Sequence, residues 1–355
     1  MRKIPIENAQ PGLILAKAVF TSEGKILLTA GITLNENFIE RLKLNNIAEI
    51  YIEDETPKSV KVSKAISEKT RREAVLLVGN IIKNYNFENS ANAERVTEIV
   101  NNIITELLAN DEIIANLSEL RNVDDYTFEH SVNVCVLSLI TGIGLGYNIP
   151  RLKDLGVGAI LHDIGKLKIP EEILKKPYQL TVEEFEEIKK HTVYGYEILK
   201  DNRNISMISA FIAFGHHERY DGSGYPLQLK SENIHKCARI VAVSDVYDAL
   251  TSDRVYRKKL KPHEVIEYIT SLGDNQFDRD IVQSFTRYIS IYPQGTGVML
   301  SNRSRGLVVK PNRGLPTRPV VKIIFDEDGA RLLHHCEIDL SAQTDIHIVD
   351  ACEID

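Results

Sequence analysis

The pattern of hydrophobic and polar positions first predicts a small mixed unit over residues 1–60. Short apolar stretches at 13–16 and 25–28 have the length and composition of strands. A helix is expected from about 35 to 44, followed by a strand at 50–52. We therefore predict a small N-terminal α+β domain, in which no motif suggests chemistry.

The pattern then becomes helical, and residues 61–117 are predicted to form a helical connector. Its apolar residues recur at i, i+3 and i+4, which is the spacing of one buried helical stripe. These residues are Val96, Ile99, Val100, Ile103, Ile104, Leu107 and Leu108. The stripe fits packing in a core, a link between domains, or a helix that forms a homodimer, and the spacing leaves these alternatives open.

Helical periodicity continues through residues 118–292, where we predict an all-α domain. Thr181 and Glu184 have the spacing of a capping box, so a helix is expected to begin there and run towards His191. After Pro293 the pattern changes to short strands separated by turns. These strands are expected at 295–300, 306–309, 319–325 and 346–349. The fold class is therefore α+β multidomain: a helical domain flanked by the N-terminal α+β domain and a β-rich C-terminal extension, residues 293–355.

Composition narrows the function classes. A length of 355 residues fits two or three domains, and the formal net charge of −7 argues against binding to DNA or RNA. The longest nearly apolar run, residues 134–146, is too short to span a membrane. Four cysteines without a C-x-x-C pair are expected to be buried thiols of a reduced, cytoplasmic protein.

The histidines are distributed unevenly, and this is the first sign of chemistry. None precedes residue 130, and five fall between residues 130 and 217, with one aspartate beside them and another downstream. These candidates are His130, His162, Asp163, His191, His216, His217 and Asp245. Each alone is most simply a core or surface residue. Together they supply about three or four ligands to each of two divalent ions, if one carboxylate bridges.

The sequence around these residues contains several recognisable motifs. Residues 161–166 read LHDIGK, residues 214–226 read FGHHERYDGSGYP, and residues 245–251 read DVYDALT. Tyr126 and Thr127 precede His130, while Arg254, Tyr256 and Arg257 follow the last motif. With these motifs in this order, residues 118–291 resemble the HD-GYP family of the HD phosphohydrolase superfamily. The resemblance implies a phosphodiesterase that cuts cyclic di-GMP to linear pGpG, and often on to GMP.

The resemblance also implies a division of the ligands. His130, His162, Asp163 and Asp245 would hold one ion, and Asp163, His191, His216 and His217 would hold the other. Family members contain iron and sometimes manganese, so the resemblance implies Fe first and Mn next. The nitrogen-rich set without thiolate favours either of these over Mg and does not choose between them. Some members use a glutamate four residues before the first histidine to bind a third metal. Tyr126 occupies that position here, so we expect two ions.

The remaining site residues follow from the expected chemistry. A hydroxide bridging the two ions would attack phosphorus, with Asp163 and Lys166 acting in catalysis and Lys166 offsetting the developing charge. Lys166 also fits a cation at a helix end. Arg254 and Arg257, three residues apart, fit either a clamp on the second phosphate or a solvated basic face. Tyr225 would stack on a guanine or line the pocket mouth. Tyr225 lies in the segment 221–226, called the GYP or HD-GYP loop below, and in the family this loop also docks diguanylate cyclase domains.

Three alternatives remain at this point. The chain fits, in principle, an HD hydrolase that acts on a mononucleotide, although the complete GYP loop and the paired arginines argue against it. Some relatives prefer cyclic GMP-AMP, and the sequence does not show whether this chain prefers cyclic di-GMP or cyclic GMP-AMP. The third alternative is a signalling adaptor, which would bind a cyclic dinucleotide and catalyse its hydrolysis weakly or not at all. Degenerate members usually lose metal ligands, and all seven expected ligands are present here.

Overall fold

We analysed a computed structural model of the chain. The structure describes residues 2–20, 26–45, 47–52, 65–83, 90–109, 126–176, 178–252, 260–292, 294–312, 314–332, 336–352 and 354. The chain divides into two compact units. Residues 64–115 and 128–291 form a helical unit, and residues 1–63, 116–127 and 292–355 form the other.

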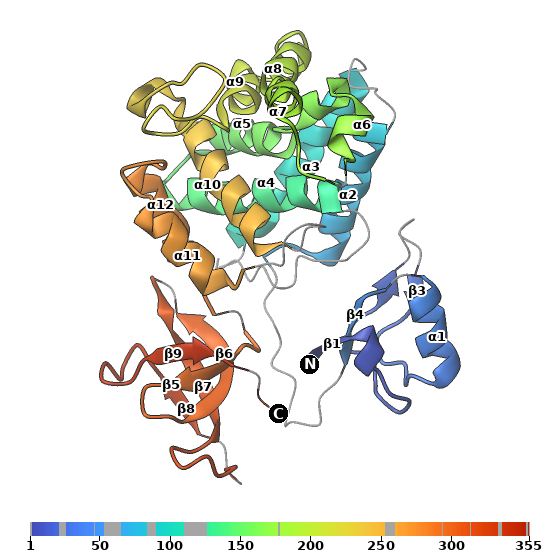
Figure 1. Ribbon diagram of the computed structural model, residues 1–355, viewed down its shortest axis with the longest axis vertical. Helices are drawn as coiled ribbons and strands as arrows, with labels where there is room; N and C mark the ends of the chain where they lie inside the picture. Colours follow the sequence, from blue (N-terminus) through green and yellow to red (C-terminus); the bar gives the residue numbers. More distant parts are fainter. Residues whose placement is uncertain are drawn as a thin grey trace. The chain divides into compact units, whose positions relative to one another are not determined.

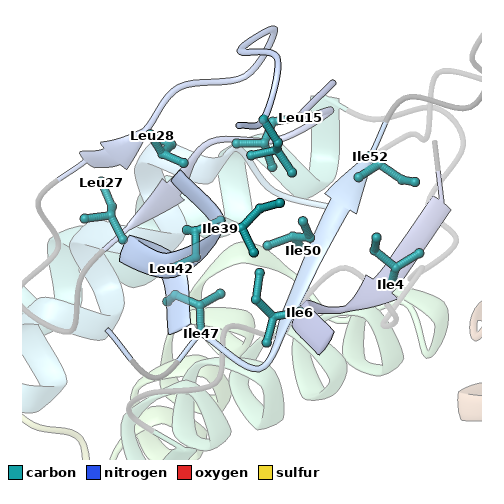
Figure 2. Close-up of a cluster of buried hydrophobic side chains, with 11 residues drawn as sticks. Ile4, Ile6, Leu15, Leu27, Leu28, Ile39, Leu42, Ile47, Ile50 and Ile52 are labelled. Atoms are coloured by element: carbon teal, nitrogen blue, oxygen red, sulfur yellow. The ribbon is translucent and has the colours of Figure 1, made fainter. Parts of the chain in front are cut away.

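The N-terminal part is built from two small antiparallel strand pairs and a helix. The elements are β1 (Arg2–Pro5), η1 (Ile6–Asn8), β2 (Val19–Phe20), β3 (Ile26–Leu28), α1 (Glu36–Leu44) and β4 (Glu49–Ile52), with β1 paired to β4 and β2 to β3. The helix begins where Asn35 Oδ1 accepts a hydrogen bond from the Phe38 amide at 2.8 Å. Aliphatic side chains from all these elements except β2 form one buried cluster (Figure 2).

The expected elements of this part are mostly present. The helix at 35–44 and the strand at 50–52 appear as α1 and β4. The apolar stretch at 13–16 contributes only isolated bridges at Ile14 and Leu15 rather than a strand. Burial of Leu15 beside Ile50 and Ile52 explains the apolar signal without a paired strand.

The helical unit contains the predicted all-α domain (Figure 1). Its elements are α2 (Glu68–Lys83), α3 (Ser90–Ala109), α4 (Tyr126–Gly144), α5 (Ile149–Ile160), η3 (Ile164–Lys168), α6 (Glu171–Leu174), α7 (Val182–Lys189), α8 (His191–Lys200), α9 (Met207–Gly215), η4 (Ser231–Asn233), α10 (Lys236–Thr251), α11 (Pro262–Ser271) and α12 (Arg279–Tyr288). Residues 130–142 of α4 are all buried, so this helix is covered on every face by its neighbours.

Local sequence sets the start of the helix that leads to the site. Thr181 Oγ1 accepts from the Glu184 amide at 3.2 Å, and the Glu184 carboxylate accepts from the Thr181 amide at 2.7 Å. The predicted capping box is therefore confirmed. It starts α7, which ends at Lys189, and α8 begins two residues later with His191 at its first position.

The helices predicted as a connector belong to the helical unit. Val100 of α3 packs so closely on α5 that a Cβ at Gly156 would lie 2.6 Å from its Cγ1. Arg71 of α2 pairs with Glu129 of α4 at 3.6 Å. The predicted stripe is buried within this unit apart from Leu108, which is 46% exposed. A homodimer and the proposed domain boundaries stay predictions.

The C-terminal part is a five-stranded antiparallel sheet. Its strands are β5 (Gly297–Leu300), β6 (Arg305–Asn312), β7 (Leu315–Phe325), β8 (Glu337–Asp339) and β9 (Ile348–Ala351), in the order β8-β7-β6-β5-β9. Four of these strands overlap the predicted ones. The sequence did not predict β8, because Glu337–Asp339 has one apolar residue between two charged ones. The α+β multidomain fold class is confirmed.

Two further expectations can be compared with the structure. None of the described helices is both long and apolar enough to cross a bilayer. Cys135 and Cys237 are buried, as predicted, but Cys336 is exposed and Cys352 is partly exposed. The prediction of four buried thiols was wrong for these two. Cys336 directly precedes β8 and Cys352 directly follows β9, so both lie at the ends of short strands.

Candidate metal centre

Side chains from five separate elements converge at one place in the helical unit. His130 lies on α4, His162 and Asp163 lie at the turn between α5 and η3, His191 begins α8, His216 and His217 follow α9, and Asp245 lies on α10. All seven candidate ligands are therefore brought together, although 115 residues separate the first from the last in sequence. The helices supply a rigid frame, which suits a centre that must hold ions at fixed positions.

The seven side chains form two adjacent groups. His130, His162 and Asp245 make one group, and Asp163, His191, His216 and His217 make the other, with ligand atoms within 4.8 Å of one another in each. The rings of His162 and His216 join the groups at a centroid distance of 4.9 Å. Two neighbouring sets of this kind can hold two cations.

Asp163 lies between the two groups, and its two oxygens face different ways. Oδ2 is 3.4 Å from His162 Nε2, whereas Oδ1 is 3.4 Å from His191 Nε2 and 3.9 Å from His216 Nε2. A carboxylate can bridge two cations by offering one oxygen to each. The orientation of Asp163 suits this mode, although Oδ2 is also ion-paired with Lys166 Nζ.

Backbone hydrogen bonds fix the orientation of three imidazoles. The Nδ1 atoms of His162, His191 and His216 lie 2.7, 2.7 and 2.9 Å from the carbonyl oxygens of Ala159, Ile188 and Ala213. A carbonyl can only accept, so each Nδ1 carries the proton and donates it. The unprotonated Nε2 of each ring is therefore left facing the centre, which is the usual arrangement of a metal-binding histidine.

The electrostatics favour the metal-binding forms in the group of Asp163, His191, His216 and His217. Burial lowers the pKa of His191 and His216, and lowers the pKa of His217 to about 3, so all three are neutral at pH 7. Burial opposes ionisation of Asp163, but Lys166 and the nearby imidazoles outweigh it and hold the pKa of that carboxyl well below its usual range. In the other group, burial disfavours protonation of His130, but Asp245 and Asp248 outweigh it and raise the pKa of that ring to about 10, so His130 must lose a proton before it binds a cation.

Two buried ligand atoms have no hydrogen-bond partner within the part of the chain that the structure describes. They are His162 Nε2 and Asp163 Oδ1, one beside each group. Leaving a buried polar atom unpaired costs about 1–3 kcal/mol. A cation bound by these atoms would remove that cost, so the donor set fits the expected metal ions.

Asp248 was not assigned a role from the sequence, and it contacts a predicted ligand directly. Its Oδ2 lies 2.7 Å from His130 Nδ1, and its Oδ1 accepts from Asn133 Nδ2 at 2.9 Å. It orients the His130 ring and leaves Nε2 facing Asp245 at 3.1 Å. The available signal was its position three residues after Asp245, on the same face of α10.

We expect Asp248→Asn to weaken divalent metal binding by about 10–100-fold, because a carboxylate behind a metal-binding histidine raises its basicity and fixes its orientation. Titration of the metal-free protein with Mn(II) measures this effect. Asp280→Asn, at an exposed position on α12, is the control and should bind as wild type does. Equal affinities for wild type and Asp248→Asn would remove this role.

Comparison with known proteins decides the family. The family described as an HD domain matches residues 126–281, and a KOW domain associated with the HD domain matches residues 297–355. The chain is 32% identical over 289 residues to the cyclic di-GMP phosphodiesterase PA4108 of Pseudomonas aeruginosa, covering 79% of this chain and 70% of the relative. The chain belongs to the HD-GYP family.

Two further matches show the extent of the likeness. A cyclic di-GMP phosphodiesterase of Thermotoga maritima is 40% identical over 177 residues, which cover 50% of this chain and 48% of that protein. Among solved structures, Bd1817, an HDG"Y"P protein from Bdellovibrio bacteriovorus, matches with a TM-score of 0.55 and 18% identity, over 80% of this chain and 97% of that one. At that identity the structural match supports the HD-GYP fold alone.

The structure places two of the four predicted substrate-binding residues. Lys166 Nζ lies 2.5 Å from Asp163 Oδ2, and the Tyr225 ring stacks on His217 with centroids 4.7 Å apart. Arg254 and Arg257 lie outside the described residues. Tyr126 is the first residue of α4, but its side chain is not among those that the structure describes.

The HD-GYP loop is held by a residue that the sequence left without a role. Glu218 is buried, and its carboxylate accepts from the backbone amides of Leu227 at 2.7 Å and Leu229 at 3.0 Å. The Tyr225 amide also donates to the His217 carbonyl at 3.2 Å. These bonds position Tyr225 beside the metal centre. The position of Glu218 directly after the histidine pair was the available signal.

Proposed function

We propose that this chain hydrolyses cyclic di-GMP to linear pGpG at a centre of two divalent ions. The carrying observation is Asp163, whose two oxygens face two separate histidine groups. Membership of the HD-GYP family supports a phosphodiesterase, and the named relatives act on cyclic di-GMP. An adaptor that only binds the dinucleotide would not need two adjacent groups of metal-binding side chains.

The residues proposed to hold the ions are those of the two groups, with Asp163 shared between them. Five imidazoles and two carboxylates without thiolate suit Fe or Mn. When bound, such ions would supply Lewis acidity, which would lower the pKa of a nearby water and offset the charge of phosphate oxygens. Asp163 would set their spacing, and the backbone-bonded histidines would keep their positions.

Lys166 is proposed to act on the phosphate. Its ammonium lies beside Asp163, and its side chain is 36% exposed, so it stands between the buried ligands and solvent. From there it would donate to a phosphoryl oxygen as negative charge develops. Arg254 and Arg257 are proposed to bind the second phosphate, since a forked guanidinium can contact two oxygens of one phosphate.

The HD-GYP loop is proposed to serve a second purpose. Glu218 holds the backbone of Leu227 while the Leu227 side chain is 60% exposed. A fixed loop that presents an apolar side chain suits contact with a partner protein, because little ordering is required on binding. We propose that a diguanylate cyclase domain is the partner.

The proposed function is tested by anaerobic hydrolysis assays with Fe(II) or Mn(II). We expect turnover of cyclic di-GMP to pGpG, and loss of turnover when the metal is removed by a chelator. Cyclic GMP-AMP, dGTP and AMP are assayed in parallel. Turnover of dGTP or AMP without turnover of either cyclic dinucleotide would overturn the proposal, as would full activity of the metal-free protein.

A further inference from the structure

An exposed aromatic side chain lies on α7, the helix that precedes the candidate ligand His191. Phe185 is 46% exposed, and no residue of α7 is fully buried. One turn later, Lys189 places its ammonium 4.9 Å from the centroid of the Phe185 ring. Glu186 holds the same ammonium at 2.6 Å. The ring and the cation therefore stand together at the surface.

These side chains are continuous with the metal centre. The Lys189 ammonium is also 5.6 Å from the centroid of the Tyr225 ring. Tyr225 in turn stacks on His217 with centroids 4.7 Å apart and an interplanar angle of 26°. The side chains of Tyr225, Lys189 and Phe185 thus follow one another from the candidate ligand His217 towards solvent.

This arrangement has the chemistry of a nucleobase site. A base stacks on an exposed aromatic ring irrespective of its hydrogen-bonding pattern, because every base has a π face. A neighbouring ammonium adds attraction for the π system and for phosphate oxygens. A cyclic dinucleotide whose scissile phosphate lies at the ions must extend at least one base away from them. The path through Tyr225 and Lys189 leads such a base to Phe185.

We propose that Phe185 and Lys189 form a stacking platform for one nucleobase of the substrate. This inference rests on the proposed function, because it takes the cyclic dinucleotide as the ligand. Phe185 contributes binding free energy through its ring face, and the Lys189 ammonium lies near both that ring and the Tyr225 ring. Neither contacts the reacting phosphorus. The platform accepts guanine and adenine alike, so it sets affinity for dinucleotides rather than the choice of base.

The test separates binding of the base from chemistry at the centre. Phe185→Ala should raise the KM for cyclic di-GMP by about tenfold and leave kcat largely unchanged, since one stacked base contributes about that factor or more. Phe185→Trp should restore the wild-type KM. Bis(p-nitrophenyl) phosphate carries no nucleobase, so the ratio of its kcat/KM to the kcat/KM of cyclic di-GMP should rise in Phe185→Ala by about tenfold.

The control is Phe211→Ala on α9. Phe211 has a similar exposure of 43%, but it stacks on Tyr196 with centroids 5.8 Å apart. Its loss should leave the KM for cyclic di-GMP within about twofold of wild type. An unchanged KM in Phe185→Ala, or an equal loss of activity on both substrates, would overturn the platform.

The proposed function and the platform fail in different ways. If the wild-type protein cleaves neither compound, the proposed function fails, and the platform is then judged from equilibrium binding of cyclic di-GMP alone. Phe185→Ala should still weaken that binding by about tenfold. Equal dissociation constants for wild type and Phe185→Ala would reject the platform whatever the activity.

Discussion

Asp163→Asn is expected to abolish phosphodiesterase activity and to lower the metal content from two ions per chain to one or none. The substitution keeps the size of the side chain but replaces one oxygen with an amide nitrogen, which cannot bind a cation. It also removes the charge shared between the two histidine groups. Loss of several kcal/mol of transition-state stabilisation corresponds to a fall in kcat/KM of about 1000-fold or more.

Metal analysis and kinetics on the same sample measure both parts of this expectation. Asp201→Asn is the control, because Asp201 is an exposed aspartate at the end of α8. It should keep full activity and both ions. An Asp163→Asn protein with wild-type turnover would show that Asp163 neither bridges nor contributes to the chemistry.

Gly165→Ala replaces none of the candidate ligands, and yet it should be strongly disruptive. A Cβ at Gly165 would lie 1.9 Å from the carbonyl oxygen of His191 and 2.4 Å from the amide nitrogen of Gly195. Both atoms belong to the backbone of α8, so no side-chain rotation can relieve the contact. We expect a loss of about 3 kcal/mol or more in the free energy of unfolding. Because η3 and α8 must separate, Asp163 and His191 would move apart and activity would fall by about 100-fold.

Gly215→Ala provides the matched control. Gly215 precedes the candidate ligand His216, but a Cβ there would meet Ala238 Cβ at 3.5 Å, an ordinary contact. Chemical denaturation should place this variant within about 1 kcal/mol of wild type. Equal stability of the two glycine variants would contradict the close approach of η3 and α8.

The candidate ligands could be identified from the sequence because of the motifs in which they occur. A single histidine carries little information, but LHDIGK and the paired histidines of the GYP segment appear together only in a restricted group of proteins. Helix starts were also readable where chemistry is local, as at Thr181 and Glu184. These features depend on neighbouring residues, which the sequence displays directly.

Other features depend on packing between distant residues, and the sequence does not display them. The apolar stripe of α3 has the same spacing whether it faces α5 or a second chain, so its partner could not be read. The bond from Asp248 to His130 spans 118 positions. The opposite orientation of the two Asp163 oxygens also arises only when α5, α8 and α9 are assembled. The tertiary fold, rather than local pattern, determines each of these.

The central claim is that the two histidine groups hold one cation each and share Asp163. Anomalous diffraction from crystals of the Mn(II)-loaded protein tests it most directly. We expect two peaks, one among His130, His162 and Asp245 and the other among His191, His216 and His217, both in contact with Asp163. A single peak, or peaks away from these side chains, would contradict the account.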